Sequence, residues 1–148
     1  MSLRRLPRRL MLVSLLAGAG GVAAAHWFNI AANREDGLSV QAAHAAAADG
    51  AVTLIDIRRP DEWASTGVGE GAIPFDMRDL HFSNKLMTLA ASPDAPIALI
   101  CARGVRSRHM TARLTEAGFT NVTDVPEGML GSGAGPGWLK SGLPVMRP

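Results

Sequence analysis

The chain has 148 residues, of which 47% are apolar, 19% charged and 5% aromatic. This length fits one globular domain with a short extension and excludes two full domains. The apolar content is too high, and the net charge of +2 too small, for wholesale disorder. A single cysteine excludes both an internal disulfide framework and a cysteine-rich zinc module.

The positive charge is concentrated at the N-terminus. Residues 1–25 contain four arginines and no acid, which leaves 11 of the 15 Lys and Arg residues against all 13 Asp and Glu residues in the rest of the chain. Binding to nucleic acid requires a clustered excess of Lys and Arg on the folded part. We therefore expect no nucleic-acid partner.

The N-terminal segment has the pattern of an export signal. Four arginines between residues 4 and 9 precede an apolar run over residues 10–25, which ends in three alanines. This run of 16 residues is shorter than the roughly 20 that cross a membrane as a helix. We expect residues 1–25 to be a cleaved signal peptide that directs the chain to the periplasm, by either the general or the twin-arginine route. The alternative is a retained membrane anchor over residues 10–25, with the domain outside the cytoplasm.

The rest of the chain is predicted to be one domain. Residues 26–37 form a connector, and residues 38–148 alternate between helical and strand patterns. Ser39 can cap a helix over residues 40–48, which Asp49-Gly50 ends. Residues 51–57 are a β-branched run typical of a strand buried on both faces.

The elements that follow continue the alternation. A helix is predicted to begin at Pro60, and residues 67–71 form a Gly-rich stretch before residues 72–75. A helix over residues 80–91 and a strand over residues 96–101 come next. The chain then predicts a helix over 106–117, closed by Gly118, a strand over 119–125, and a packed loop over 128–142 around Trp138. The alternation indicates an α/β fold with a parallel sheet, whose ligands lie at the carboxyl ends of the strands.

One loop carries the chemistry that the sequence predicts. Residues 101–107, Cys-Ala-Arg-Gly-Val-Arg-Ser, join a strand to a helix, so successive backbone N–H groups can point inward. Arg103 and Arg106 add positive charge, which favours the thiolate form of Cys101. Gly104 permits a close turn or a positive φ. We interpret Cys101 as a nucleophile, and the alternative is an inert buried cysteine.

Several segments occur in an order that is more specific than any one of them. They are Leu54-Ile-Asp-Ile-Arg-Arg-Pro-Asp-Glu-Trp63, then Cys101-Ala-Arg-Gly-Val-Arg106, then Ala117-Gly-Phe-Thr-Asn-Val122, and finally the passage from Glu127 to Val145. Over about residues 38–145 the chain resembles single-domain rhodaneses, a family of sulfurtransferases.

The resemblance implies a parallel sheet flanked by helices on both faces and a sulfurtransferase activity. Cys101 would take a sulfane sulfur from a small sulfur-containing anion such as thiosulfate, and the resulting persulfide would pass it to a thiol, cyanide or protein acceptor. No metal or organic cofactor is expected. The inward amides would stabilise the anionic sulfur, Arg106 would shape and charge the loop, and Arg103 would hold the sulfonate end of the donor. The expected substrate-binding residues are Arg103, Arg106, Ala102, Gly104, Val105 and Ser107.

The chain departs from the family's pattern at two places. Gly67-Val-Gly-Glu-Gly-Ala72 stands where many relatives have Gly-His-Ile-Pro-Gly-Ala, and a longer loop over residues 130–137 follows Glu127-Gly128-Met129. The longer loop is expected to reshape the mouth of the pocket. The identity of the donor therefore stays open.

Two other functions remain as alternatives. Related phosphatases and arsenate reductases have an active loop one residue longer, whereas four residues separate Cys101 from Arg106 here. The second alternative is a non-catalytic module that carries a persulfide for a partner protein, with residues 129–138 as an exposed docking surface.

The remaining polar candidates have supporting or no functional roles. Asp56 could orient Arg106 or Arg58, and we expect Asp56 and Arg58 to support the structure. His109 follows the loop, but a relay that starts from a thiolate needs no general base. The other three histidines, His26, His44 and His81, show no metal-ligand spacing, so no metal site is expected.

Overall fold

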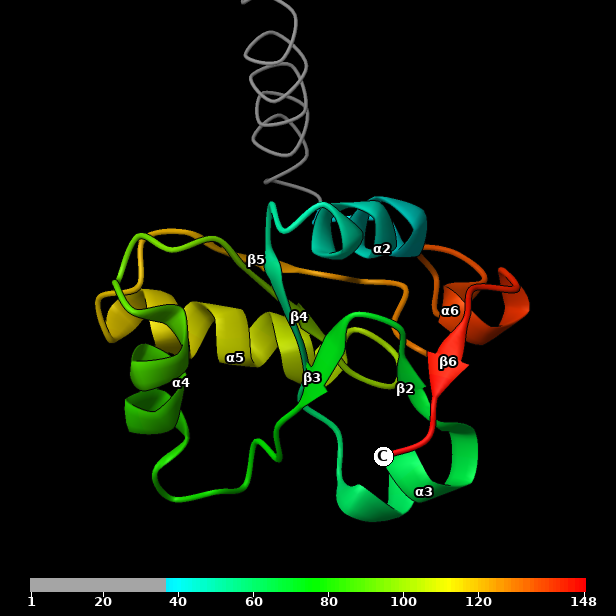
Figure 1. Ribbon diagram of the computed structural model, residues 1–148, viewed down its shortest axis with the longest axis horizontal. Coiled ribbons are helices and arrows are strands. Elements are labelled where there is room, and N and C mark those ends of the chain that lie inside the picture. Colours follow the sequence, from blue (N-terminus) through cyan, green and yellow to red (C-terminus); the bar gives the residue numbers. More distant parts are fainter. Residues whose placement is uncertain (1–36) are drawn as a thin grey trace, which may run out of the picture.

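The structure is a computed structural model that describes residues 37–148 (Figure 1). The expected leader over residues 1–25 and residues 26–36 of the connector lie outside the described residues. Within the described part, none of the helices has the length and apolar character that crossing a membrane requires.

The centre of the domain is a parallel sheet of four strands in the order β3-β1-β4-β5. Its strands are β1 (Thr53–Asp56), β3 (Ala72–Pro74), β4 (Ile97–Ile100) and β5 (Val122–Asp124). In the register of the two central strands, Asp56 lies beside Ile100, so both strands end at the same edge. The prediction of an α/β fold with a parallel sheet is confirmed.

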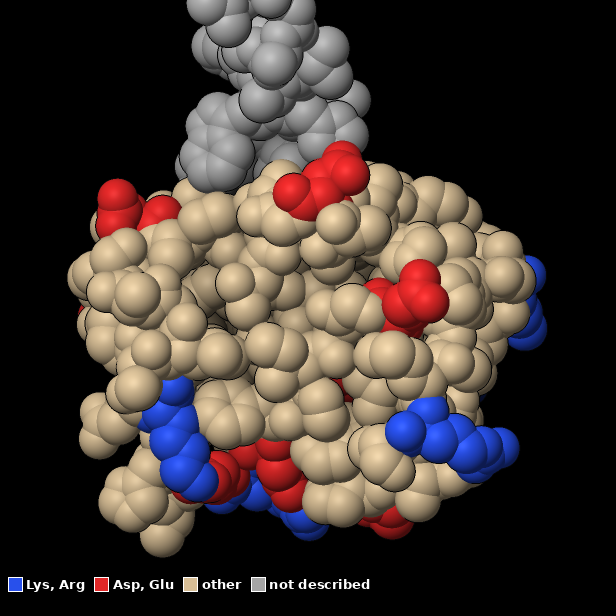
Figure 2. Space-filling view, in the orientation of Figure 1, with Lys and Arg blue, Asp and Glu red and all other residues tan. Residues whose placement is uncertain are grey.

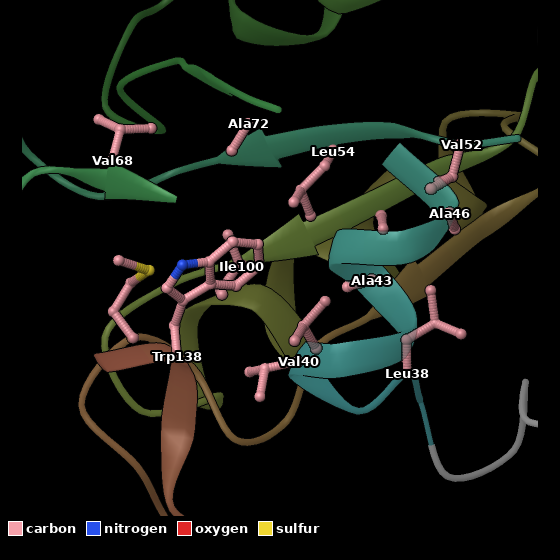
Figure 3. Close-up of a cluster of buried hydrophobic side chains, with 13 residues drawn as sticks. Leu38, Val40, Ala43, Ala46, Val52, Leu54, Val68, Ala72, Ile100 and Trp138 are labelled. Atoms are coloured by element: carbon pink, nitrogen blue, oxygen red, sulfur yellow. The ribbon is translucent and has the colours of Figure 1, made fainter. Parts of the chain in front are cut away.

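Helices cover both faces of this sheet because successive side chains of a strand point to opposite sides. On one face, strand residues such as Leu54 and Ile100 pack against α2 (Val40–Ala48) and the short α6 (Gly137–Lys140). Figure 3 shows this cluster, in which the indole of Trp138 lies at the centre. On the other face, a second cluster packs against α4 (Phe82–Ala90) and α5 (Val105–Glu116) (Figure 1).

The helix ends follow the local signals in the sequence. The Ser39 hydroxyl accepts a hydrogen bond from the Ala42 amide at 3.2 Å, which caps α2 as predicted. Helix α3 (Pro60–Thr66) starts at the proline, whose fixed φ suits the first helical position. Gly118 follows α5 with a φ of 99° and closes it.

A second, antiparallel sheet was not predicted. It pairs β2 (Val68–Gly69), inside the Gly-rich stretch, with β6 (Val145–Met146) near the C-terminus. Each strand has only two residues, so neither carries a detectable periodicity, and their pairing depends on contacts between distant parts of the chain. At Gly69 a Cβ atom would lie 2.7 Å from the Trp138 ring, so this strand can approach the core only as glycine.

The interpretation of residues 129–138 as an exposed docking surface is wrong at both ends. Met129 and Trp138 are each 0% exposed and belong to the core beneath α2. The middle of the segment, around Gly133 and Ala134, is exposed. The large apolar side chains therefore anchor this loop to the domain and are not available to a partner.

The distribution of charge can be followed on one face of the molecule in Figure 2. Uncharged side chains predominate there, and the Lys and Arg side chains lie in separate groups near the edge of the view. This face offers no continuous basic area of the kind that binds phosphate backbones.

Candidate active site

The candidate nucleophile lies where a parallel sheet usually places its ligand. Cys101 directly follows β4, and α5 begins four residues later at Val105. Asp56, the last residue of β1, lies at the same sheet edge. Side chains from both central strands thus meet at the carboxyl ends, as the sequence predicts.

Two polar groups approach the sulfur of Cys101. The Gly104 amide donates a hydrogen bond to Sγ at 3.2 Å, and the Ser107 hydroxyl lies 3.4 Å from Sγ. The same hydroxyl lies 3.2 Å from the Gly104 carbonyl oxygen, to which it donates. The sequence predicts that the backbone amides between Ala102 and Ser107 point inward. In the described structure, the amide of Gly104 is the one that donates a hydrogen bond to the sulfur. The sulfur therefore has a donor suited to an anion.

The loop holds this shape because a later segment of the chain supports it. The Met129 amide donates to the Cys101 carbonyl at 2.8 Å, and the Leu130 amide donates to the Ala102 carbonyl at 2.9 Å. Gly104 has a φ of 80°, and a Cβ atom there would lie 2.2 Å from the Pro126 carbonyl oxygen. Only glycine satisfies both the positive φ and the close approach.

The thiol is enclosed to a greater degree than the sequence suggests. Cys101 is 1% exposed, whereas the loop pattern predicts an accessible thiolate. The enclosure comes from the support by residues 126–130 and from packing against the α4 and α5 side of the sheet. These are tertiary contacts, so the pattern of the loop alone does not predict them.

Arg106 is held beside the thiol by a carboxylate that the sequence analysis missed. Its two terminal nitrogens donate to the Glu62 carboxylate at 2.8 and 2.6 Å. Hydrogen bonding by Arg106 lowers the pKa of Glu62 to about 2, although partial burial opposes the shift. The pKa of Arg106 is raised, mainly by Glu62 and further by the charge of Cys101. A signal for this pair was available, because Glu62 lies in the first turn of α3, just after β1 ends at the same sheet edge.

Asp56 orients Arg58 and not Arg106. The Arg58 Nη2 atom lies 2.7 Å from the Asp56 carboxylate, and these side chains are 1% and 0% exposed. The Arg58 guanidinium also donates to the Thr66 hydroxyl at 2.8 Å and to the Gly67 carbonyl at 2.7 Å. The pair thereby connects the end of β1 to the end of α3, the helix that carries Glu62.

A cavity of about 330 Å³ lies on the other side of the loop. Three basic side chains line it, those of Arg103, Arg108 and His109, together with residues 132–134 of the long loop. Arg103 also donates to the Gly131 carbonyl at 3.2 Å. Cys101 is not among the residues that line this cavity. His109, to which the sequence analysis assigned no role, thus lies in the wall of a pocket.

Asp124 is a buried carboxylate near the same side of the loop. Burial raises its pKa, and the Ser107 hydroxyl and the charge of Arg108 oppose this shift in part. Its Oδ1 atom is buried and has no hydrogen-bond partner among residues 37–148. Unlike Glu62, this carboxylate has no partner that compensates fully for its loss of water.

The described residues contain no group of three or more His, Cys, Asp or Glu side chains that could hold a metal ion. His44 lies 3.2 Å from the Glu70 carboxylate and contacts the edge of the Trp138 ring. His26 lies outside the described residues.

Comparisons with solved structures identify the fold. The polysulfide-sulfur transferase homodimer of Wolinella succinogenes is 24% identical, with 83% of this chain and 88% of that chain covered and a TM-score of 0.58. A protein of unknown function from Rhodopseudomonas palustris, described as a possible tyrosine phosphatase, is 24% identical, with 84% and 93% covered and a TM-score of 0.55. The human single-domain sulfurtransferase TSTD1 is 19% identical, with 62% and 89% covered and a TM-score of 0.51.

These identities establish a shared fold and leave the activity of the chain open. No curated protein sequence matches the chain significantly. The Rhodanese-like domain family matches residues 39–132, which include β1, the loop of Cys101 and β5. The protein therefore belongs to the rhodanese-like domain family.

Proposed function

We propose that the protein is a sulfurtransferase that moves a sulfane sulfur from an anionic donor such as thiosulfate to a thiophilic acceptor through a persulfide on Cys101. The observation that carries the proposal is the hydrogen bond from the Gly104 amide to Cys101 Sγ at 3.2 Å, inside a loop at the end of a parallel strand. Membership of the rhodanese-like family supports the same chemistry.

The reaction has two displacement steps. The Cys101 thiolate attacks the outer sulfur of thiosulfate, a new S–S bond forms, and sulfite leaves with the electron pair of the broken S–S bond. An acceptor thiolate or cyanide then attacks the outer sulfur of the persulfide. This step forms the acceptor persulfide or thiocyanate and returns the electron pair to Cys101 as a thiolate.

Three residues of the loop have different roles in the reaction. The Gly104 amide stabilises negative charge on sulfur in both steps. Arg106, whose two terminal nitrogens are bonded to Glu62, fixes the shape of the loop beside the thiol. Arg103 stands at the loop position where a cation would hold the sulfonate of the donor and stabilise the departing sulfite.

The burial of Cys101 has a consequence for the second step. With 1% of the residue exposed, the thiolate suits a small donor. A persulfide places its reactive sulfur about 2.05 Å beyond Sγ, toward the mouth of the loop. The acceptor then needs to reach only this outer atom, so it is allowed to be larger than the donor.

Intact-mass measurement tests the proposal directly. Treatment of the purified protein with thiosulfate is expected to add the mass of one sulfur atom, and cyanide is expected to remove it as thiocyanate. Cys101→Ser is the control and is expected to show neither change. A wild-type mass that thiosulfate leaves unchanged would overturn the proposal.

The two alternatives are separated by the same protein sample. Release of phosphate from an aryl phosphate, lost in Cys101→Ser, would favour a phosphatase over a sulfurtransferase. A persulfide that forms but resists cyanide and small thiols would favour a carrier that discharges only to a protein partner. Steady thiocyanate production from thiosulfate and cyanide favours the enzyme.

We also propose that the domain acts in the periplasm after export, on the basis of the arginines and the apolar run in residues 1–25. N-terminal sequencing of the protein from a periplasmic extract is expected to begin at His26. A retained N-terminus in the membrane fraction would indicate the anchor instead, and a retained N-terminus in the cytoplasm would contradict export.

A further inference from the structure

We propose that the cavity beside the loop binds the carboxylates of the acceptor, and that the preferred acceptor is a small thiol with two or more of them. The inference rests on the proposed sulfurtransferase function and names the class of its second substrate.

The composition of the cavity wall defines the charge of its ligand. Arg103, Arg108 and His109 contribute cationic or hydrogen-bond-donating side chains, and the part of the lining that the structure describes contains no Asp or Glu. Ser132 also lines the cavity, and its hydroxyl donates to the Pro126 carbonyl at 2.7 Å. Arginine side chains bind carboxylates through paired charge-assisted hydrogen bonds. The wall is therefore complementary to an anion and not to a neutral or cationic molecule.

The charge of Arg108 is available to such a ligand. The charge of Arg108 acts on Asp124, which does not line the cavity, and it opposes in part the rise in the pKa of Asp124 that burial causes. This contrasts with Arg106, in which both terminal nitrogens are bonded to Glu62. An anion in the cavity would thus give Arg108 a counter-charge on the side of the cavity, where the described lining residues supply none.

The volume of the cavity suits a molecule larger than the donor. A volume of about 330 Å³ is far larger than cyanide or thiosulfate requires and lies near the lower end of the range of pockets for organic ligands. Gly104 belongs to this wall and also donates its amide to Cys101 Sγ. Gly104 thus joins the cavity wall to the sulfur, and the acceptor would enter after sulfite has left Arg103.

A series of thiols that differ in charge tests the inference. Acceptance of sulfur from the Cys101 persulfide is compared for mercaptosuccinate, with two carboxylates, 3-mercaptopropionate, with one, and 2-mercaptoethanol, with none, each at equal thiolate concentration. We expect KM to fall in the order of increasing carboxylate number. Arg108→Gln is expected to raise the KM for mercaptosuccinate about tenfold relative to that for 2-mercaptoethanol, since a charge-assisted hydrogen bond contributes on that scale.

Arg113→Gln is the matched control, because Arg113 lies on the same helix, is exposed, and is not part of the cavity. It is expected to leave the preference for mercaptosuccinate unchanged. Equal effects of the two substitutions would show that only the overall charge matters and would overturn the proposal. A wild-type protein without any preference among the three thiols would overturn it as well.

A binding measurement keeps the inference separate from the proposed function. Succinate cannot accept sulfur, but it is expected to bind to Cys101→Ser protein and to shift the backbone amide NMR signals of Gly133 and Ala134, and Arg108→Gln is expected to abolish the shift. Absence of this shift would contradict the cavity as a carboxylate site even if thiosulfate loads Cys101. A shift in a protein that thiosulfate does not load would support the site while the sulfurtransferase proposal fails.

Discussion

The two sides of the active loop carry arginines in opposite electrostatic situations. On the side of α3, Arg106 forms two short hydrogen bonds with Glu62, and these side chains are 31% and 19% exposed. On the side of the long loop, Arg103 and Arg108 line a cavity that contains no acid. One side is internally neutralised, and the other keeps its positive charge for a ligand.

The carboxylates nearest to these two sides differ in the same way. Arg106 lowers the pKa of Glu62 to about 2, whereas burial raises the pKa of Asp124. Glu62 thus stabilises the folded state as an anion, and an ionised Asp124 destabilises it. On the α3 side, the paired charges of Glu62 and Arg106 fix the loop. On the cavity side, the buried carboxylate of Asp124 lowers the stability of the folded domain.

Gly104 lies between the two sides, and its substitution is expected to have the largest effect. Gly104→Ala forces a Cβ atom to within 2.2 Å of the Pro126 carbonyl at a φ of 80°. Strain and overpacking together are expected to destabilise the domain by about 2–5 kcal/mol and to remove the amide from the sulfur. Chemical denaturation and persulfide loading measure the two effects.

Gly50→Ala is the matched control for this substitution. Gly50 has a φ of 69°, and a Cβ atom there meets nothing within 4 Å. Its substitution is expected to cost only the backbone strain, about 1–2 kcal/mol, and to leave persulfide loading intact. Equal losses of stability in the two variants would show that the approach to Pro126 is unimportant.

Glu62→Gln breaks the neutralised side and is expected to have the next largest effect. Arg106 loses its counter-charge and one of its two acceptors, because the side-chain NH2 group of Gln donates, so the guanidinium is no longer fixed in one position. The rate of persulfide formation from thiosulfate is expected to fall about tenfold, the equivalent of one charge-assisted hydrogen bond. Stopped-flow measurement of sulfite release follows this step.

Asp61→Asn controls for the general loss of a carboxylate from α3. Asp61 is 67% exposed, and both of its carboxylate oxygens accept hydrogen bonds from Arg59 on the surface. We expect a change in rate of less than about twofold. A drop as large as that of Glu62→Gln would assign the effect to the helix and not to the pair with Arg106.

Asp124→Asn relieves the cost on the cavity side. An amide has no charge to bury, so the variant is expected to be more stable than wild type at neutral pH, with a melting temperature higher by about 2–5 °C. Calorimetry at pH 7 measures this change. A lower melting temperature would show that the ionised carboxylate makes a stabilising interaction.

The smallest expected effect is the change with pH in the stability differences between wild type and these two variants. Because the folded pKa of Glu62 is about 2, below its usual 4.5, its stabilisation is present above pH 4.5 and is lost as the pH falls through about 2. The folded pKa of Asp124 is above its usual 3.8, so its destabilisation develops as the pH rises through that raised pKa and is absent below 3.8.

In acid, wild type is therefore expected to become no more stable to unfolding than Glu62→Gln. Likewise, Asp124→Asn is expected to become no more stable than wild type. Thermal unfolding from pH 2 to 7 records both differences. A difference between wild type and Glu62→Gln that stays constant down to pH 2 would contradict the assignment of the low pKa to this pair.

The sequence predicted the parts of the molecule that depend on local signals. The cap at Ser39, the start of α3 at Pro60 and three of the four parallel strands follow from patterns within a few residues of each element, whereas β3 was not predicted as a strand. The position of Cys101 at the end of β4 follows from the same patterns, because strand ends in a parallel sheet share an edge.

The partners of the loop depended on tertiary structure. The choice of Glu62 as the partner of Arg106, with Asp56 paired to Arg58 instead, depends on how α3 lies against the sheet edge. The enclosure of Cys101 depends on residues 126–130, which a sequence pattern does not place against the loop. Both arise from contacts between segments that are distant in the chain.

The support of the loop by residues 126–130 has a consequence for biosynthesis. Met129 and Leu130 follow Cys101 in the chain, and so does β6, which closes the small sheet against β2. A nascent polypeptide that ends before Pro126 holds the cysteine without the wall that encloses it. The thiol of Cys101 is therefore enclosed only after residues 126–130 have been synthesised and have docked against the loop.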